Sequence, residues 1–284
     1  MKFRAKMYDP ITIRQFYDAL SSVPKASKHS ILRLSQDHFF FIYMDPCVNS
    51  AIMWCQLRVD NFFSEYVLEG VTSEDPEIYL DIPHALMSQS LCQSMKTAVA
   101  TVKCVKVKLT RKHEQACLSF YIEMVGNRQC IHDIPVTPVP RKDWSDFEEP
   151  TISPTEEIVR MNIDVKQLKH FAERYKHLGT FATFIAPQNG KKPLEMELQS
   201  EKAKLRTEFK TCKAIKENLS ALADKENGVV EVKCELKKLS SFLAADHIRT
   251  QRCVASFVNK KMLHLCLVND ELTLQYFFPS YNHS

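Results

Sequence analysis

Apolar and polar positions follow two different periods along this chain, and the helical period recurs four times at nearly even spacing. Amphipathic segments begin near Ile11, His84, Asp164 and Leu236, with gaps of 73, 80 and 72 residues between them. Recurrence at such intervals predicts a duplicated architecture. The stretches between these segments alternate apolar and polar residues, which predicts β-strands.

The third segment has the clearest helical pattern. The spacing predicts a helix over Asp164–Leu178, with Asp164 near its N-cap and Gly179 as its C-terminal stop. Its apolar stripe consists of Leu168, Phe171, Ala172, Tyr175 and Leu178. The same reasoning predicts the other helices at Ile11–Leu20, about His84–Ala100, and Leu236–Ala245.

The order of predicted strands and helices is similar in the two halves of the chain. Each half begins with a strand and a helix, continues with several strands and a second helix, and ends with three strands. This order predicts an α+β fold of two similar domains, each a mostly antiparallel sheet with its helices on one face. A Pro-rich, acidic stretch separates the halves, which predicts domains at 1–136 and 153–284 with a connector at 137–152.

Composition narrows the classes of function. The 284 residues are 45% hydrophobic with a net charge of +4, so nucleic-acid contact would depend on local placement of Lys and Arg. The chain has only five glycines and no Gly-rich phosphate-binding motif, which argues against nucleotide binding through such a loop, and no cofactor is expected. The charged N-terminus lacks an apolar signal core, and no apolar run is long enough to predict a membrane span.

The ten cysteines favour a structural role. No CxxC pair occurs, and the spacing of Cys253, His264 and Cys266 matches no zinc pattern, so no metal site is expected. In a reducing compartment, small buried thiols are the expected state. Because a Cys–His nucleophile pair is a spatial arrangement, a Cys-dependent enzyme remains open as an alternative.

Lysines recur in or beside all four predicted helices. A basic helical face is usually only solvated, but recurrence on helices that cover one side of a sheet would place the ammonium groups on a common surface. Such a surface suits contacts to DNA phosphates without sequence readout. The candidate DNA-facing residues are Lys25, Lys28, Lys96, Lys166, Lys169, Lys176, Lys237 and Lys238.

Several short motifs occur in a fixed order along nearly the whole chain, most densely in the N-terminal half. They are Met1–Lys6, Met53–Cys55, Asn61–Glu65, Leu68–Val71, Glu77–Leu80, Val107–Thr110 with Lys112 and His113, His132–Pro135, Pro140–Lys142 with Trp144, and Leu272–Pro279. Together these motifs resemble the hydroxyurea-sensitivity checkpoint family, the Hus subunits of the nine-one-one DNA-damage clamp within the PCNA-like sliding-clamp superfamily.

The resemblance implies a sliding-clamp fold, in which three different subunits form a ring around DNA with helices lining the hole. It implies a non-enzymatic nuclear protein with two paralogous clamp partners, a clamp loader, encircled double-stranded DNA, and checkpoint and repair factors. Two exposed strand edges would extend the sheets onto neighbouring subunits. The edge residues implied are Cys130, Ile131, His132, Asp133, Ile134, Ala203, Leu205, Thr207 and Phe209.

Three alternatives stay open from the sequence. Within the same fold, the chain could be a homotrimeric replication clamp. In other classes, it could be the Cys-dependent enzyme or a structural scaffold with no role in nucleic-acid binding. The acidic run Asp146–Glu149 departs from the usual connector pattern, so client contacts at the connector are not carried over.

Overall fold

The computed structural model divides into two compact units. The first contains residues 1–44, 54–149 and 270–273, and the second contains 45–53, 150–269 and 274–284. The residues whose structure is described are 1–22, 28–44, 51–70, 72, 76–96, 101–153, 155–188, 192–200, 204–215, 228–243, 252–269 and 271–281. None of the described helices is long and apolar enough to span a membrane.

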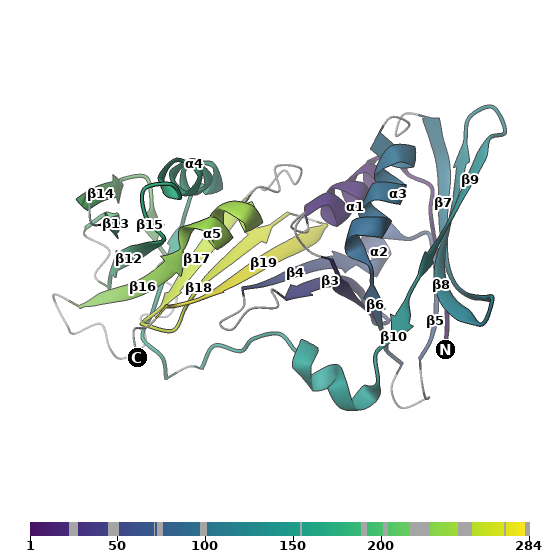
Figure 1. Cartoon of the computed structure of the whole chain (residues 1–284), viewed down its shortest axis with the longest axis horizontal. Helices are drawn as coiled ribbons and strands as arrows, with labels where there is room; N and C mark the ends of the chain where they lie inside the picture. Colours follow the sequence, from purple (N-terminus) through teal and green to yellow (C-terminus); the bar gives the residue numbers. More distant parts are fainter. Residues whose placement is uncertain are drawn as a thin grey trace. The chain divides into compact units, whose positions relative to one another are not determined.

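The first unit contains two antiparallel sheets, of strand orders β5-β1-β7-β8-β9 and β10-β6-β2-β3-β4 (Figure 1). Helices α1 and α3 pack against each other, and α3 also contacts β9. The elements are β1 Lys2–Met7, α1 Pro10–Ser22, β2 Ser30–Leu34, β3 His38–Met44, β4 Ile52–Arg58, α2 Val59–Phe62, β5 Glu65–Glu69, β6 Ile78–Ile82, α3 His84–Lys96, β7 Val102–Lys112, β8 Gln115–Met124, β9 Gln129–Pro135, β10 Thr137–Pro138 and the 3-10 helix η2 Arg141–Phe147.

An aromatic cluster forms the core between α1 and the strands of this unit. Phe16 of α1 lies 5.7 Å from Phe39 and 6.2 Å from Phe63, measured between ring centroids. Phe3 of β1 is 6.3 Å from Phe39. Each of these rings is buried, and burying such side chains is the dominant favourable contribution to folding.

The predicted connector has more structure than its composition indicates. β10 pairs with β6, and η2 follows directly. The Trp144 ring stacks on Tyr79 at 4.4 Å, and its indole N–H donates to the Val139 carbonyl at 3.0 Å. The Arg33 guanidinium lies 5.5 Å from the centre of the Tyr79 ring and pairs with Glu77 at 2.7 Å. These contacts hold the start of the connector against the first unit.

The second unit repeats the plan with sheets of order β14-β13-β12-β16 and β19-β18-β17-β11-β15. Helices α4 and α5 pack side by side (Figure 1). The elements are β11 Ile158–Asn162, α4 Val165–Tyr175, β12 Phe181–Pro187, β13 Leu194–Gln199, β14 Lys204–Phe209, β15 Lys213–Ala214, β16 Val229–Glu235, α5 Leu236–Leu243, β17 Arg252–Val258, β18 Met262–Val268 and β19 Leu272–Pro279.

The four predicted helices are present within the described residues. α4 begins after Asp164, whose carboxylate accepts a hydrogen bond from the Lys166 backbone amide at 2.9 Å. The helix ends at Tyr175, three residues before the predicted end. The predicted C-terminal ends of α3 and α5, at Ala100 and Ala245, lie outside the described residues. The one-turn helix α2 and the 3-10 helix η2 were not predicted.

Candidate nucleic-acid and subunit interfaces

Helix α4 presents its basic residues in different surroundings. Its buried residues Leu168, Phe171 and Ala172 fix the orientation of the helix. Lys166 is exposed, whereas the Lys169 ammonium lies 3.8 Å from the Glu173 carboxylate. Lys176 Nζ donates to Ser240 Oγ of α5 at 3.2 Å. These three lysines therefore belong to one helical layer, with the charge of Lys169 offset by Glu173.

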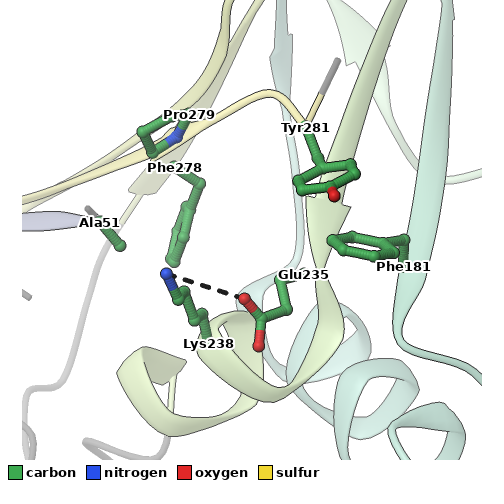
Figure 2. A pocket seen from close by; sticks show the side chains of 7 residues that line it. All are labelled: Ala51, Phe181, Glu235, Lys238, Phe278, Pro279 and Tyr281. Carbon is green, nitrogen blue, oxygen red and sulfur yellow. Dashed lines mark ion pairs between the residues drawn. The ribbon is translucent and has the colours of Figure 1, made fainter. Parts of the chain in front are cut away.

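Helix α5 places Lys237 in solvent and Lys238 beside a small pocket of about 90 Å³. Figure 2 shows that the Lys238 ammonium points toward Glu235, with which it forms an ion pair at 3.7 Å. Phe181 and Tyr281 stack at 4.3 Å on another wall of the pocket. The Glu235 carboxylate reduces the charge that Lys238 can offer to an external anion.

The remaining candidate lysines belong to the first unit. Lys28 is exposed two residues before β2. Lys25 lies outside the described residues, and so does the side chain of Lys96, the last residue of α3. Within the described structure, the candidate DNA-facing lysines of the two units are thus Lys28 in the first and those of α4 and α5 in the second.

Strand β9 is the outermost described strand at one side of the sheet β5-β1-β7-β8-β9. It contains Cys130, Ile131, His132, Asp133 and Ile134, and the Ile131 side chain is 51% exposed. Hydrogen bonds from Lys112 at 2.6 Å and Ser119 at 2.6 Å lower the pKa of Asp133. Burial lowers the pKa of His132. The edge therefore exposes an apolar residue and an aspartate that already has partners.

Strand β14 is the edge of the four-stranded sheet in the second unit. Leu205 and Thr207 are half-buried and Phe209 is buried, while Ala203 lies outside the described residues. The Arg206 guanidinium forms an ion pair with Glu195 on the neighbouring strand. Among the described strands, both strands predicted as exposed edges are therefore the outermost of their sheets, and their outer backbone groups pair with no described strand.

A groove that the sequence did not predict lies between α4 and β14. Its volume is about 420 Å³. The signal for it in the sequence is the spacing of Gln167, His170 and Arg174 along one side of α4. These residues line a groove only because β14, about thirty residues further along the chain, lies next to α4. That placement is decided by the tertiary fold. The lining residues are Lys166, Gln167, His170, Phe171, Arg174, Tyr175, Thr207, Glu208 and Phe209.

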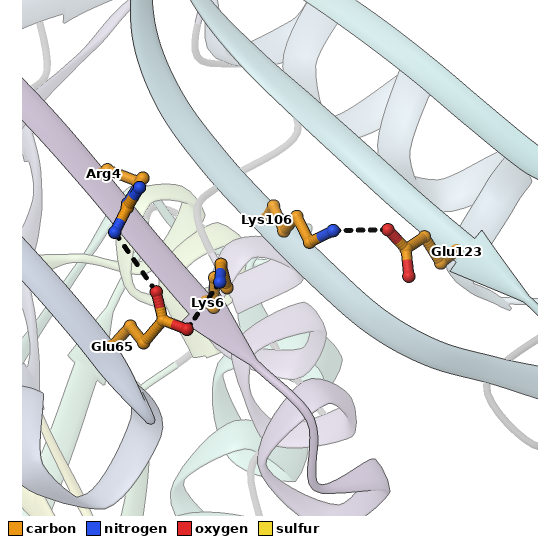
Figure 3. A network of polar contacts seen from close by, with 5 residues as sticks. All are labelled: Arg4, Lys6, Glu65, Lys106 and Glu123. Atoms are coloured by element: carbon orange, nitrogen blue, oxygen red, sulfur yellow. Dashed lines mark hydrogen bonds and ion pairs between the residues drawn. The ribbon is translucent and has the colours of Figure 1, made fainter.

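Three basic residues on the sheet β5-β1-β7-β8-β9, Arg4, Lys6 and Lys106, are matched by carboxylates (Figure 3). Glu65 lies 2.5 Å from Lys6 and 3.3 Å from Arg4, and Lys106 lies 2.5 Å from Glu123. The hydrogen bond from Lys6 lowers the pKa of Glu65, and the same bond raises that of Lys6. This face of the first unit is a weaker candidate for phosphate contacts than α4.

Most of the described cysteines lie in the interior, which is not the environment of a catalytic nucleophile. Buried thiols are found at Cys55, Cys104, Cys117, Cys234 and Cys253. Burial raises the pKa of Cys253 to about 12 and that of Cys212 to about 11, which opposes thiolate formation. Among the described residues, no group of three or more His, Cys, Asp or Glu side chains is placed to hold a metal ion.

Comparison with known proteins relates this geometry to a family. A family model described as "Hus1-like protein" matches residues 1–282. The human "Checkpoint protein HUS1" is 32% identical over 287 residues, and the "Checkpoint protein Hus1-like" of Drosophila melanogaster is 23% identical over 288, each alignment covering 99% of both chains. The crystal structure of Proliferating Cellular Nuclear Antigen from Entamoeba histolytica aligns with a TM-score of 0.69 at 12% identity, covering 99% of both chains. The predicted PCNA-like α+β clamp fold is therefore confirmed.

Proposed function

This chain belongs to the Hus1-like family, and from that premise we propose that it is one subunit of a heterotrimeric DNA-damage checkpoint clamp. In this proposal the chain joins two paralogous subunits in a ring, which a clamp loader opens and closes around double-stranded DNA. The ring then recruits checkpoint signalling and repair factors in the nucleus and catalyses no reaction itself.

The observation that carries the proposal is the likeness to human "Checkpoint protein HUS1" over 99% of both chains, on a fold shared with a sliding clamp. A likeness that covers both units supports a clamp subunit with domains at 1–136 and 153–284 joined by a connector at 137–152. The raised pKa values of Cys212 and Cys253 disfavour the Cys-dependent enzyme.

The proposed DNA-facing surface consists of the helix lysines, with Lys166 and Lys237 as its exposed members in the second unit. Lysines bind phosphates irrespective of sequence, and each such contact releases counterions. Because Glu173 and Glu235 offset Lys169 and Lys238, the intrinsic affinity for DNA is expected to be weak. Retention on DNA then depends on enclosure by the ring.

The proposed contacts between subunits are the edges β9 and β14. An exposed strand edge can continue its sheet onto a neighbouring chain by backbone hydrogen bonds. Such contacts between unlike surfaces are heterologous and close a ring when the rotation permits. In a ring of three different chains, each edge of this chain would meet a different partner.

The test is assembly followed by retention on DNA. The chain is co-expressed with its two paralogues, and native mass spectrometry determines the composition of the complex. A one-to-one-to-one complex is expected, whereas a stable homotrimer of this chain alone would contradict the proposal and support a replication-type clamp. The assembled ring, loaded on a nicked circular plasmid, should be released when the plasmid is linearised.

The lining assignment is tested by charge reversal. Replacing Lys25, Lys166, Lys169 and Lys237 together with Glu should weaken DNA association of the assembled ring and flatten its dependence on salt. Reversal of Lys2 and Lys142, which are exposed and lie outside the four helices, is the control. Unchanged retention of the fourfold variant at low salt would show that these lysines do not face the DNA.

A further inference from the structure

The groove between α4 and β14 has an aromatic floor. Phe171 of α4 and Phe209 of β14 are 4% and 5% exposed, with ring centroids 6.2 Å apart. The Tyr175 ring lies 4.3 Å from Phe171 on the same helix. Phe209 is the last residue of β14, which is the outermost of the described strands in its sheet. If a strand of a partner subunit paired with β14 at that edge of the sheet, the helix packed beside the partner's strand would cover the aromatic floor.

The rim of the groove is basic. Lys166, His170 and Arg174 line it from α4, and among the described residues Glu208 is the one carboxylate that lines it. Each of the three α4 side chains belongs to an exposed residue. The Arg174 guanidinium lies 5.8 Å from the Tyr175 ring centre, and neither Arg174 nor Lys166 forms an ion pair with a described residue. The groove therefore offers cations to an acidic partner.

The two cations of β14 itself are already matched by carboxylates of the neighbouring strand β13. Arg206 of β14 pairs with Glu195, and Lys204 lies 3.8 Å from Glu197. The contrast with Arg174 shows that the excess positive charge is concentrated on the α4 side of the edge. A partner that complements the groove must therefore carry its acidic group on the element that covers α4, beside an apolar group for the floor.

A second copy of this chain does not supply that chemistry. In a head-to-tail ring its β9 edge and the adjacent α3 would face the groove. The sequence of α3, HALMSQSLCQSMK, contains no Asp or Glu and ends in a lysine. The aspartate of β9, Asp133, already accepts hydrogen bonds from Lys112 and Ser119. A self-complex would leave the Arg174 charge without a counter-charge as it is desolvated, which is costly.

We infer that the α4–β14 groove selects a different clamp subunit over a second copy of this chain. The selected subunit presents an edge helix with a carboxylate opposite Arg174 and Lys166 and an apolar side chain over Phe171 and Phe209. Because α3 contains no Asp or Glu, binding of a second copy of this chain is disfavoured. The basic rim favours a subunit that carries a carboxylate at the corresponding position. This inference rests on the proposed hetero-ring and adds the chemistry of one partner.

The experiment uses the full chain co-expressed with its two paralogous subunits. Arg174→Glu, alone and with His170→Glu, is compared with wild type by native mass spectrometry and by the affinity for each paralogue. Neither residue is among the proposed DNA-facing lysines. The affinity for one paralogue should fall by about tenfold or more, as expected for charge reversal at a desolvated charge pair. The affinity for the other paralogue should stay unchanged. The control variant Lys2→Glu/Lys192→Glu should retain both, and an unchanged melting temperature verifies folding.

The outcomes separate this inference from the proposed function. If the wild-type chain binds neither paralogue, the hetero-ring itself is wrong. If the wild type binds both paralogues and Arg174→Glu binds both equally well, the groove does not select a partner. Retention of both subunits with loss of DNA binding would assign Arg174 to DNA and overturn the inference. Self-association of the wild-type chain that Arg174→Glu abolishes would overturn it as well.

Discussion

His84 makes the stability of the first unit sensitive to acid. It is the first residue of α3, is 2% exposed, and its Nδ1 lies 3.2 Å from Ser30 Oγ. Burial lowers the pKa of His84 to about 4, and a hydrogen bond with the Leu20 backbone opposes this shift without cancelling it. A helix N-terminus also disfavours a positive charge. The folded chain therefore keeps this imidazole neutral.

The size of the effect follows from linkage. The unfolded chain takes up the proton at a pKa near 6.5 and the folded chain only near 4, so protonation favours the unfolded state. The contribution of neutral His84 to the free energy of unfolding is fully present above about pH 6.5 and is lost as the pH falls toward 4. At about 1.4 kcal/mol per pKa unit, the total loss is ~3 kcal/mol, of which ~2 kcal/mol has occurred at pH 5.

Urea denaturation followed by tryptophan fluorescence measures this loss, because both tryptophans, Trp54 and Trp144, belong to the first unit. Between pH 7.5 and pH 5, the free energy of unfolding of the wild type should fall by ~2 kcal/mol more than that of His84→Asn. The control His177→Asn, at an exposed histidine of the second unit, should follow the wild type. Equal pH dependence of wild type and His84→Asn would refute the reasoning, as would an NMR titration midpoint for His84 above pH 6.

Three further predictions concern other elements. Asp164→Ala removes the hydrogen bond to the Lys166 amide and should destabilise the second unit by about 1 kcal/mol in urea, whereas Asp164→Asn should restore most of it. Trp144→Ala removes the stack on Tyr79 and should increase the rate of limited proteolysis within 141–149; an unchanged rate would mean that η2 is held by other contacts. Cys253 should react with a thiol reagent at pH 7.5 far more slowly than a free cysteine, and rapid labelling mapped to it by mass spectrometry would contradict the burial that raises its pKa.

Local patterns predicted the regular elements best where one periodicity extends over several turns. The α4 stripe and the Asp164 cap act between residues close in sequence, so this helix was predicted to within three residues at its end. One-turn α2, Val59–Phe62, has no such period and was partly included in the preceding strand. The Pro-rich composition indicated a connector, but the η2 helix within it depends on Tyr79, which is distant in sequence.

Some features of the candidate interfaces could likewise be predicted from the sequence, and others depend on the tertiary structure. The sequence by itself determined the two α+β halves and the basic helices, because amphipathic period and charge are local properties, whereas the two edge strands were expected only from the family resemblance. Only the tertiary structure decided which lysines have carboxylate partners and that Arg174 and Phe209 line one groove. The physical reason is that ion pairing and groove formation depend on distances between side chains from different elements, and those distances are set by packing of the whole unit.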